Sequence, residues 1–258
     1  MELHLSGEKL KGALESLIAR ADEHGGVETY VAALKLKAQV FRDALDAGLE
    51  LKAFRTMCAH MATVRRRIGR YAQAEAFPGM KQSIDMLLDQ DDTQQTDRRI
   101  ADFCSRFPDD RDHRWVRDLA AELLHNADPE RYPLMTRWVW DARANTGVLR
   151  EIWHGENVDG MTIEVPDTYA TFVQLREELA QYLTANGVFR DVLFYADMLV
   201  AQVYADYIGE RGGTYLRTDF STAEDPMLHA RRILGLDGVS SSGKMKLKAA
   251  DGRAEMVQ

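Results

Sequence analysis

Asp197 is the carboxylate with the most unusual surroundings in this sequence. It lies in the stretch 188–208, VFRDVLFYADMLVAQVYADYI, where apolar side chains cover nearly the whole circumference of a helix. Such a helix has to be surrounded by other elements, so we expect it to be central and its carboxylate to be buried. A buried carboxylate needs a partner or has a raised pKa. We expect a salt bridge or hydrogen bond to an arginine of a neighbouring element, and a catalytic acid/base or metal-binding role is the alternative.

The loop that follows this stretch carries groups that bind anions. Arg211, Tyr215, Arg217 and Asp219 lie within ERGGTYLRTD, where glycines let backbone amides approach a ligand. Two arginines can hold a carboxylate or phosphate in a forked geometry. Together with Asp197 as the catalytic group, these residues form our candidate anion-binding site. An ordinary surface loop is the alternative interpretation.

Two Glu-x-x-His pairs have the spacing that places iron ligands on the interior face of a helix in di-iron bundles. They are Glu122 with His125 and Glu151 with His154. On the helix expected over 112–126, the apolar residues point away from the first pair, which is therefore predicted to face solvent. The second pair also faces away from its apolar neighbours as a helix, and splits to opposite faces as a strand. We expect neither a metal site nor a bound cofactor.

The C-terminal tail contains GVSSSGKM, which differs from the phosphate-binding loop GxxxxGK[ST] at its last position. Met245 cannot supply the hydroxyl that holds magnesium, and no strand is expected before the motif. We interpret the match as a coincidence. The tail 238–258 is polar and is expected to be flexible.

A basic face is predicted on the helix expected over 49–76. Lys52, Arg55, Arg66 and Arg70 fall within about 60° of one another on its wheel, opposite an apolar face. Such a face would bind phosphates or an acidic partner surface. It lacks aromatic residues for base stacking, so we favour neutralisation by the acidic segment that follows.

Composition limits the classes of protein that remain. The chain has 258 residues, 45% of them hydrophobic, which is enough for a substantial core. A net charge of -8 argues against a protein that coats nucleic acid or binds an anionic membrane. Cys58 and Cys104 lack metal or redox spacing and are interpreted as reduced, buried thiols. No export signal or membrane span is recognised, so we expect a cytoplasmic location.

The pattern predicts a mainly α fold, an antiparallel helical bundle. Aromatic and β-branched residues separated by turn chemistry predict a small β-meander at 136–166, with a helix over 129–143 and one hairpin as the alternative. We expect a helical N-terminal region over 1–127 and a helical C-terminal region over 128–237, followed by the tail. The expected helices are 7–23, 27–47, 49–76, 78–90, 93–106, 112–126, 168–185, 188–208 and 226–234.

No catalytic constellation is complete, and the amphipathic, tryptophan-rich organisation suits partner surfaces. We therefore predict a non-catalytic cytosolic interaction protein, an adaptor, regulator or assembly factor, with a protein partner. The alternative is an enzyme on a helical scaffold, metal-dependent or acting on an anionic substrate, that uses Asp197 with Arg211 and Arg217. The third interpretation, less favoured, is nucleic-acid binding through the basic face.

Overall fold

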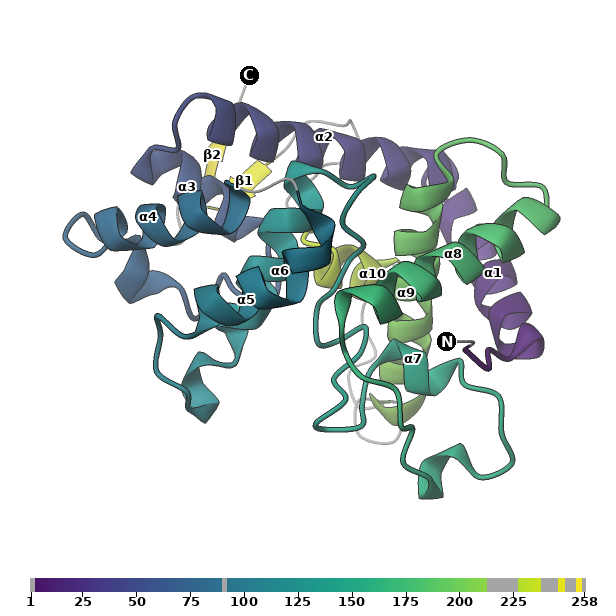
Figure 1. Cartoon of the computed structure of the whole chain (residues 1–258). Coiled ribbons are helices and arrows are strands. Elements are labelled where there is room, and N and C mark those ends of the chain that lie inside the picture. Colours follow the sequence, from purple (N-terminus) through teal and green to yellow (C-terminus); the bar gives the residue numbers. More distant parts are fainter. Residues whose placement is uncertain (1–2, 90–91, 213–226, 238–245, 249–253, 257–258) are drawn as a thin grey trace.

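The fold, taken from a computed structural model, is mainly α, as predicted (Figure 1). The structure describes residues 3–89, 92–212, 227–237, 246–248 and 254–256. In that part of the chain no helix combines the length and apolar character needed to cross a membrane. The α-helices are α1 (Gly7–Asp22), α2 (Val27–Asp46), α3 (Leu51–Ala59), α4 (Phe77–Leu88), α5 (Thr96–Cys104), α6 (Trp115–Ala127), α7 (Val148–Glu151), α8 (Tyr169–Ala185), α9 (Val192–Gly212) and α10 (Leu228–Ile233). Two short strands, β1 (Lys246–Lys248) and β2 (Ala254–Met256), pair antiparallel.

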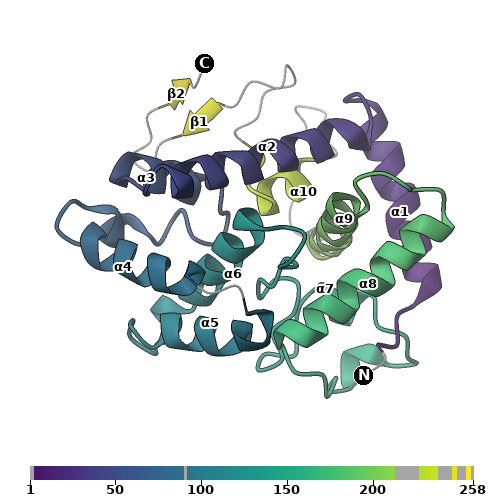
Figure 2. The same ribbon diagram turned by 45° about the horizontal axis from the view of Figure 1, so that its top comes forward.

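Helix boundaries follow local capping chemistry. The Ser6 side chain accepts a hydrogen bond from the Lys9 backbone N–H and so caps α1. Gly25 and Gly26 then adopt φ of 90° and 85°, a backbone region that favours glycine, and α2 begins at the next residue. Gly187, with φ of 92°, ends α8 in the same way. These short turns make α1 and α2, and α8 and α9, successive neighbours in space, as Figure 2 shows.

α9 is enclosed by other helices, as the sequence predicted. It contacts α1, α2, α7, α8 and α10. Figure 2 shows it nearly end-on, between α8 and α10. Every side chain from 196 to 203 is buried. The stretch expected to be central is therefore central.

α6 is a second enclosed helix, which the sequence pattern did not predict. It contacts α2, α4 and α5, and every side chain from Trp115 to Asn126 is buried except that of Arg117. α2 contacts both α6 and α9 and runs across the top of Figure 1 above them. The molecule thus has two inner helices under one long outer helix.

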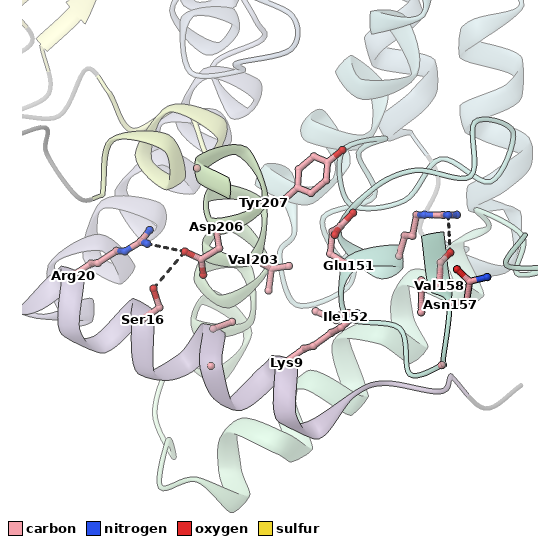
Figure 3. A pocket seen from close by; sticks show the side chains of 15 residues that line it. Lys9, Ser16, Arg20, Glu151, Ile152, Asn157, Val158, Val203, Asp206 and Tyr207 are labelled. Carbon is pink, nitrogen blue, oxygen red and sulfur yellow. Dashed lines mark hydrogen bonds and ion pairs between the residues drawn. The ribbon is translucent and has the colours of Figure 1, made fainter. Parts of the chain in front are cut away.

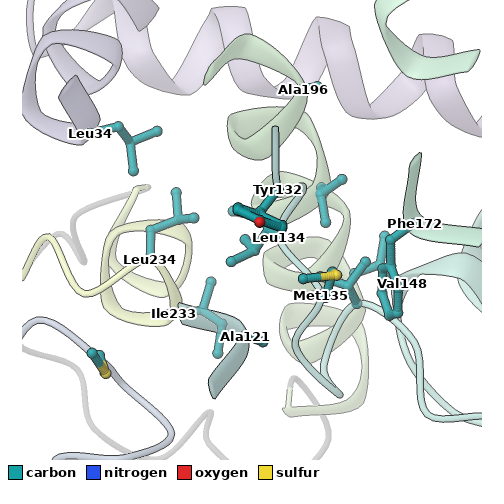
Figure 4. Close-up of a cluster of buried hydrophobic side chains, with 14 of the residues drawn as sticks. Leu34, Ala121, Tyr132, Leu134, Met135, Val148, Phe172, Ala196, Ile233 and Leu234 are labelled. Carbon is teal, nitrogen blue, oxygen red and sulfur yellow. The ribbon is translucent and has the colours of Figure 1, made fainter. Parts of the chain in front are cut away.

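One apolar core joins these elements. Figure 4 shows part of it, where Leu34 of α2, Ala121 of α6, Phe172 of α8, Ala196 of α9 and Leu234, the residue after α10, gather. Removing this apolar surface from water stabilises the fold by about 25 cal/mol per Å². The core runs through helices of both predicted regions.

The helix predicted over 49–76 is wrong beyond its first third. α3 ends at Ala59, and turns follow until a 3-10 helix at Gly69–Ala72. The Arg55 Nε atom donates to the Ala72 carbonyl oxygen at 2.8 Å. A straight helix would hold those residues about 25 Å apart, since each residue adds 1.5 Å. The chain therefore folds back on itself, and the predicted basic stripe does not exist as one helical face.

Tertiary packing explains this break better than local sequence does. The His60 backbone lies against α10, so closely that a Cβ atom on Gly235 would be 1.8 Å from the His60 carbonyl oxygen. The turns that follow bury three apolar side chains completely, those of Met61, Val64 and Ile68. Packing of this kind overrides the helical periodicity of the segment.

The β-meander predicted at 136–166 is also wrong. The segment consists of turns around α7 and a 3-10 helix at Val158–Gly160, with two isolated bridges, Asp141 to Thr146 and Trp153 to Leu5. The alternative helix over 129–143 is absent as well. Side chains here take the place of a strand ladder: Arg150 donates to the carbonyl oxygens of Met161 and Val158. Backbone groups can be satisfied in this way without forming a sheet.

Candidate functional site

A stripe of polar residues runs along the enclosed helix α6. Asp118, Glu122 and His125 occupy positions i, i+4 and i+7, which share one side of a helix. They are only 1%, 2% and 6% exposed. The prediction that Glu122 and His125 face solvent is therefore wrong, because neighbouring elements cover this side of α6 too. Each of the three side chains meets an opposite charge from another segment.

His125 connects α6 to α9 through Asp197. Its Nε2 lies 3.3 Å from Asp197 Oδ2, and its Nδ1 lies 2.9 Å from the Tyr132 carbonyl oxygen. A carbonyl oxygen only accepts, so Nδ1 carries a proton and donates it there. The other nitrogen then faces the carboxylate. Asp197 has the buried partner expected of it, but that partner is a histidine rather than an arginine.

This contact changes the protonation of His125. Burial by itself lowers the pKa of the imidazole, but the negative charge and hydrogen bond of Asp197 and the contributions of two further groups together outweigh burial, and the pKa is raised above 6.5. The Tyr132 carbonyl and Glu122 act in the same direction. Both ring nitrogens of His125 are occupied, so the ring is held inside the protein as an ion-pair partner.

Glu122 connects α6 to α2 and α10 through Lys37. Lys37 Nζ lies 2.9 Å from Glu122 Oε2 and donates to the Leu234 carbonyl oxygen at 3.0 Å. Both charged side chains are 3% exposed. Sequence analysis missed Lys37, although its spacing from Leu34 and Phe41 places it beside the apolar face of α2.

Asp118 connects α6 to the segment that follows it. The Arg137 guanidinium donates to both carboxylate oxygens, at 3.3 and 2.7 Å, and the Arg137 backbone N–H donates at 2.9 Å. This forked pairing holds both groups in a fixed orientation. The polar stripe of α6 thus joins three separate parts of the chain to one helix.

The described residues form no cluster suited to metal binding and no reactive thiol. None of their His, Cys, Asp and Glu side chains form a group of three or more that can hold a metal ion. Burial raises the pKa of the Cys58 thiol, and burial is also the main cause that raises the pKa of Cys104 to about 11. Both cysteines are free and remain protonated near neutral pH.

The larger of two adjoining pockets lies between α1, the C-terminal half of α9 and residues 150–158. Its volume is about 890 Å³. Figure 3 shows Asp206 of α9 bound to Arg20 and Ser16 of α1 on one side, with Glu151 across the pocket. Lys9 also lines it and donates to the Trp153 carbonyl oxygen at 3.3 Å. Its lining mixes apolar residues with side chains of both signs of charge.

Two glycines inside helices line this larger pocket, Gly12 in α1 and Gly209 in α9. A glycine in a helix interior costs roughly 1 kcal/mol relative to alanine. At both positions an added Cβ would meet no atom within 4 Å. Packing between the helices therefore does not require glycine there, and the missing side chains leave the pocket open.

The smaller pocket has a volume of about 500 Å³ and aromatic walls. Trp138, Tyr204 and Tyr207 line it, and the first two rings meet edge to face with centroids 5.5 Å apart. One wall is the turn at Gly147, where a Cβ would lie 2.7 Å from the Val139 carbonyl oxygen. Arg150, Glu151 and Tyr207 line both pockets, so the two adjoin there.

Of the predicted catalytic and anion-binding residues, Asp197 is the one whose side chain the structure describes. Asp197 lines neither pocket. Arg211 belongs to the last turn of α9, but its side chain and the residues Tyr215, Arg217 and Asp219 lie outside the described residues. Their convergence with Asp197 therefore stays a prediction. The pockets lie beside the C-terminal half of α9, near the region where the site was expected.

The basic-face residues are divided among different segments. Lys52 and Arg55 belong to α3, Arg66 to a turn and Arg70 to the 3-10 helix. Arg55 is bound to the Ala72 carbonyl, and Arg70 contacts Tyr71 and His113. Arg55 and Arg70 are thus already held by the protein's own groups, and Lys52 also takes part in an interaction.

Comparison of the chain with protein-family models, with curated proteins and with solved structures gave no significant match.

Proposed function

We propose that this chain is a non-catalytic interaction protein, an adaptor, regulator or assembly factor, that binds a segment of a protein partner in the larger pocket. A cytoplasmic location is part of this proposal. The observation that carries it is the pair of helical glycines, Gly12 and Gly209, that lower helix stability without a packing reason and leave this pocket open.

The pocket walls suit an extended polar segment. Lys9 of α1 and Glu151 on the opposite side add one charge of each sign to the Arg20–Asp206 ion pair that also lines the pocket. Interfaces gain specificity from such complementary charges, even where each rim contact adds little affinity. A partner segment with alternating charges would match this arrangement.

Asp197 and His125 favour a structural over a catalytic role. They are 7% and 6% exposed, are bound to each other and line neither pocket. A general acid or base needs to reach the proton that it transfers, within hydrogen-bond distance or through one water. The enclosed geometry supports binding as the activity of this chain.

Filling the pocket tests the proposal. Gly12→Gln places a side chain in the pocket, and Gly79→Gln is the matched control, because a Cβ at Gly79 in α4 also meets no atom within 4 Å. Partners captured by the wild-type chain from its native cell extract are identified by mass spectrometry and their affinities measured with purified components. We expect Gly12→Gln to weaken binding at least about tenfold while Gly79→Gln does not. Equal binding by all three chains contradicts the pocket assignment.

The rival proposal, an enzyme on a helical scaffold that uses Asp197 with Arg211 and Arg217, is favoured by one observation. The raised pKa of His125 beside Asp197 is a feature also found in acid/base pairs. Turnover of any substrate from a broad panel, lost in Asp197→Asn with the fold intact, would establish the enzyme and overturn a non-catalytic role. No specific contact favours nucleic-acid binding through Lys52, Arg55, Arg66 and Arg70.

A further inference from the structure

The smaller pocket differs from the larger one in chemistry. Its lining includes three aromatic rings, those of Trp138, Tyr204 and Tyr207, together with Val148 and Ile208. Sites for small molecules are mostly apolar hollows of roughly 300–1,000 Å³ with a few polar groups that fix orientation. The volume of about 500 Å³ falls within that range. The aromatic walls suit a flat apolar group, which stacks or meets rings edge to face.

Two arginines line this pocket, and they differ in how they are bound. Arg137 forms a forked ion pair with Asp118. Within the part of the chain that the structure describes, Arg150 donates to the carbonyl oxygens of Asn145, Met161 and Val158. A guanidinium has five N–H donors, so Arg150 keeps donors and its full positive charge for an anionic group.

Glu151 supplies a negative charge next to Arg150. It lines both pockets at the place where they adjoin. Glu151 already takes part in another interaction. A carboxylate accepts at about four positions, so a further donor can still bind to it. The pocket lining thus combines three aromatic rings with the cationic group of Arg150 and the anionic group of Glu151.

We propose that the smaller pocket binds an aromatic α-amino acid as its zwitterion. The side-chain ring lies among Trp138, Tyr204 and Tyr207, the carboxylate binds Arg150, and the ammonium group binds Glu151. This ligand offers a group to each of the three features of the pocket, whereas an aromatic acid offers no group to Glu151 and an aromatic amine offers none to Arg150. The site goes beyond the proposed protein interaction and does not depend on it.

Three probes dissect this recognition by isothermal titration calorimetry on the full chain. L-phenylalanine carries all three groups, 3-phenylpropionate lacks the ammonium group, and phenethylamine lacks the carboxylate. We expect L-phenylalanine to bind at least about tenfold more tightly than either truncated probe, since a charge-assisted hydrogen bond is lost in each. Phenethylamine tests the role of Arg150 because it lacks the carboxylate that Arg150 would bind. A substitution of Arg150 is less suitable, since it would also remove the donor to three backbone carbonyl oxygens.

Two variants test the other walls. Tyr204→Leu should weaken all three probes, because each stacks its ring there. Glu151→Gln should weaken L-phenylalanine and phenethylamine but leave 3-phenylpropionate unchanged, while Glu156→Gln, an exposed neighbour outside both pockets, should change none. Thermal unfolding of each variant establishes that it is folded.

The proposal is overturned if L-phenylalanine does not bind, if the three probes bind equally, or if folded Tyr204→Leu binds as the wild type does. These results leave the partner-binding proposal untouched, since Gly12 lines only the larger pocket. Loss of partner binding in Gly12→Gln with normal L-phenylalanine binding would separate the two sites.

Discussion

α6 and α9 are both enclosed helices, but different interactions make their burial favourable. In α9 the buried turns from Ala196 to Val203 are mostly apolar, with Asp197 and Gln202 as the polar residues. In α6 the buried side chains include Asp118, Glu122 and His125, each of which is paired with a charge from another segment. A polar stripe therefore marks the solvent side of a helix only when no opposite charges face it.

The two kinds of burial should respond differently to substitution. Truncating an apolar side chain removes contacts and leaves a cavity, which the surroundings can partly fill. Removing one member of a buried ion pair leaves a charge that nothing can compensate. The polar side of α6 should consequently be the most sensitive part of the fold.

The largest effect is expected when Lys37 loses its charge. Lys37→Met should lower the free energy of unfolding by about 3–5 kcal/mol, because Glu122 would remain buried without its ammonium partner. Lys35→Met is the matched control: its pair with Asp191 is exposed, so the loss should be about 0–1 kcal/mol. Urea unfolding of both variants measures the difference. Equal losses would show that the pair at Glu122 is accessible to water.

Apolar truncation in each helix tests whether α6 is as enclosed as α9. Leu119 and Leu199 are both 0% exposed, so Leu119→Ala and Leu199→Ala should each cost about 2–5 kcal/mol. Leu36→Ala, at a side chain that is 40% exposed, should cost about 1 kcal/mol or less. Chemical denaturation gives all three values. A small loss for Leu119→Ala would contradict the burial of α6.

The contact between the two helices should depend on pH. The pKa of His125 is raised above 6.5 in the folded chain, so the native state holds this proton more tightly than the unfolded state. The stabilisation is complete below about pH 6.5 and is lost as pH rises through the raised value. The stability difference between wild type and Asp197→Asn, measured at several pH values, should therefore shrink above pH 6.5. A difference that grows with pH would mean that His125 is buried neutral.

The smallest effect, with the opposite sign, is expected at Gly12 of α1, which lines the larger pocket beside α9. Gly12→Ala should raise the free energy of unfolding by up to about 1 kcal/mol, since alanine is the better helix former and a Cβ meets no atom within 4 Å. Thermal and urea unfolding measure it. A loss of stability would show that the helices need glycine there for packing, which removes the main support for a binding pocket.

Much of the fold could be predicted from the sequence because its helices carry local signals. Ser6 and the glycines at 25 and 26 delimit α1, and the nearly continuous apolar surface of 188–208 indicates a central helix. The break after Ala59 could not be predicted, since it depends on the approach of the His60 backbone to Gly235, far along the chain. The absence of a sheet at 136–166 could not be predicted either, because side chains there form hydrogen bonds with backbone groups that strands would otherwise pair.

The candidate site divides in the same way. The burial of Asp197 followed from hydrophobic periodicity, whereas the site expected at Arg211, Tyr215, Arg217 and Asp219 stays a prediction. The identity of the partner of Asp197 could not be predicted. His125 lies in a polar stripe, and such a stripe looks the same in the sequence whether the helix faces solvent or faces opposite charges. Nor could the pockets be predicted, since α1 and residues 144–158 line them only through tertiary packing.

One buried ion pair, His125 with Asp197, joins α6 to α9. A double-mutant cycle of His125→Met and Asp197→Leu, measured as unfolding free energies below pH 6.5, tests it most directly. We expect each single variant to lose about 3–5 kcal/mol and the double variant to be more stable than either, because it buries no unpaired charge. Losses that add to within about 0.5 kcal/mol would contradict the pair.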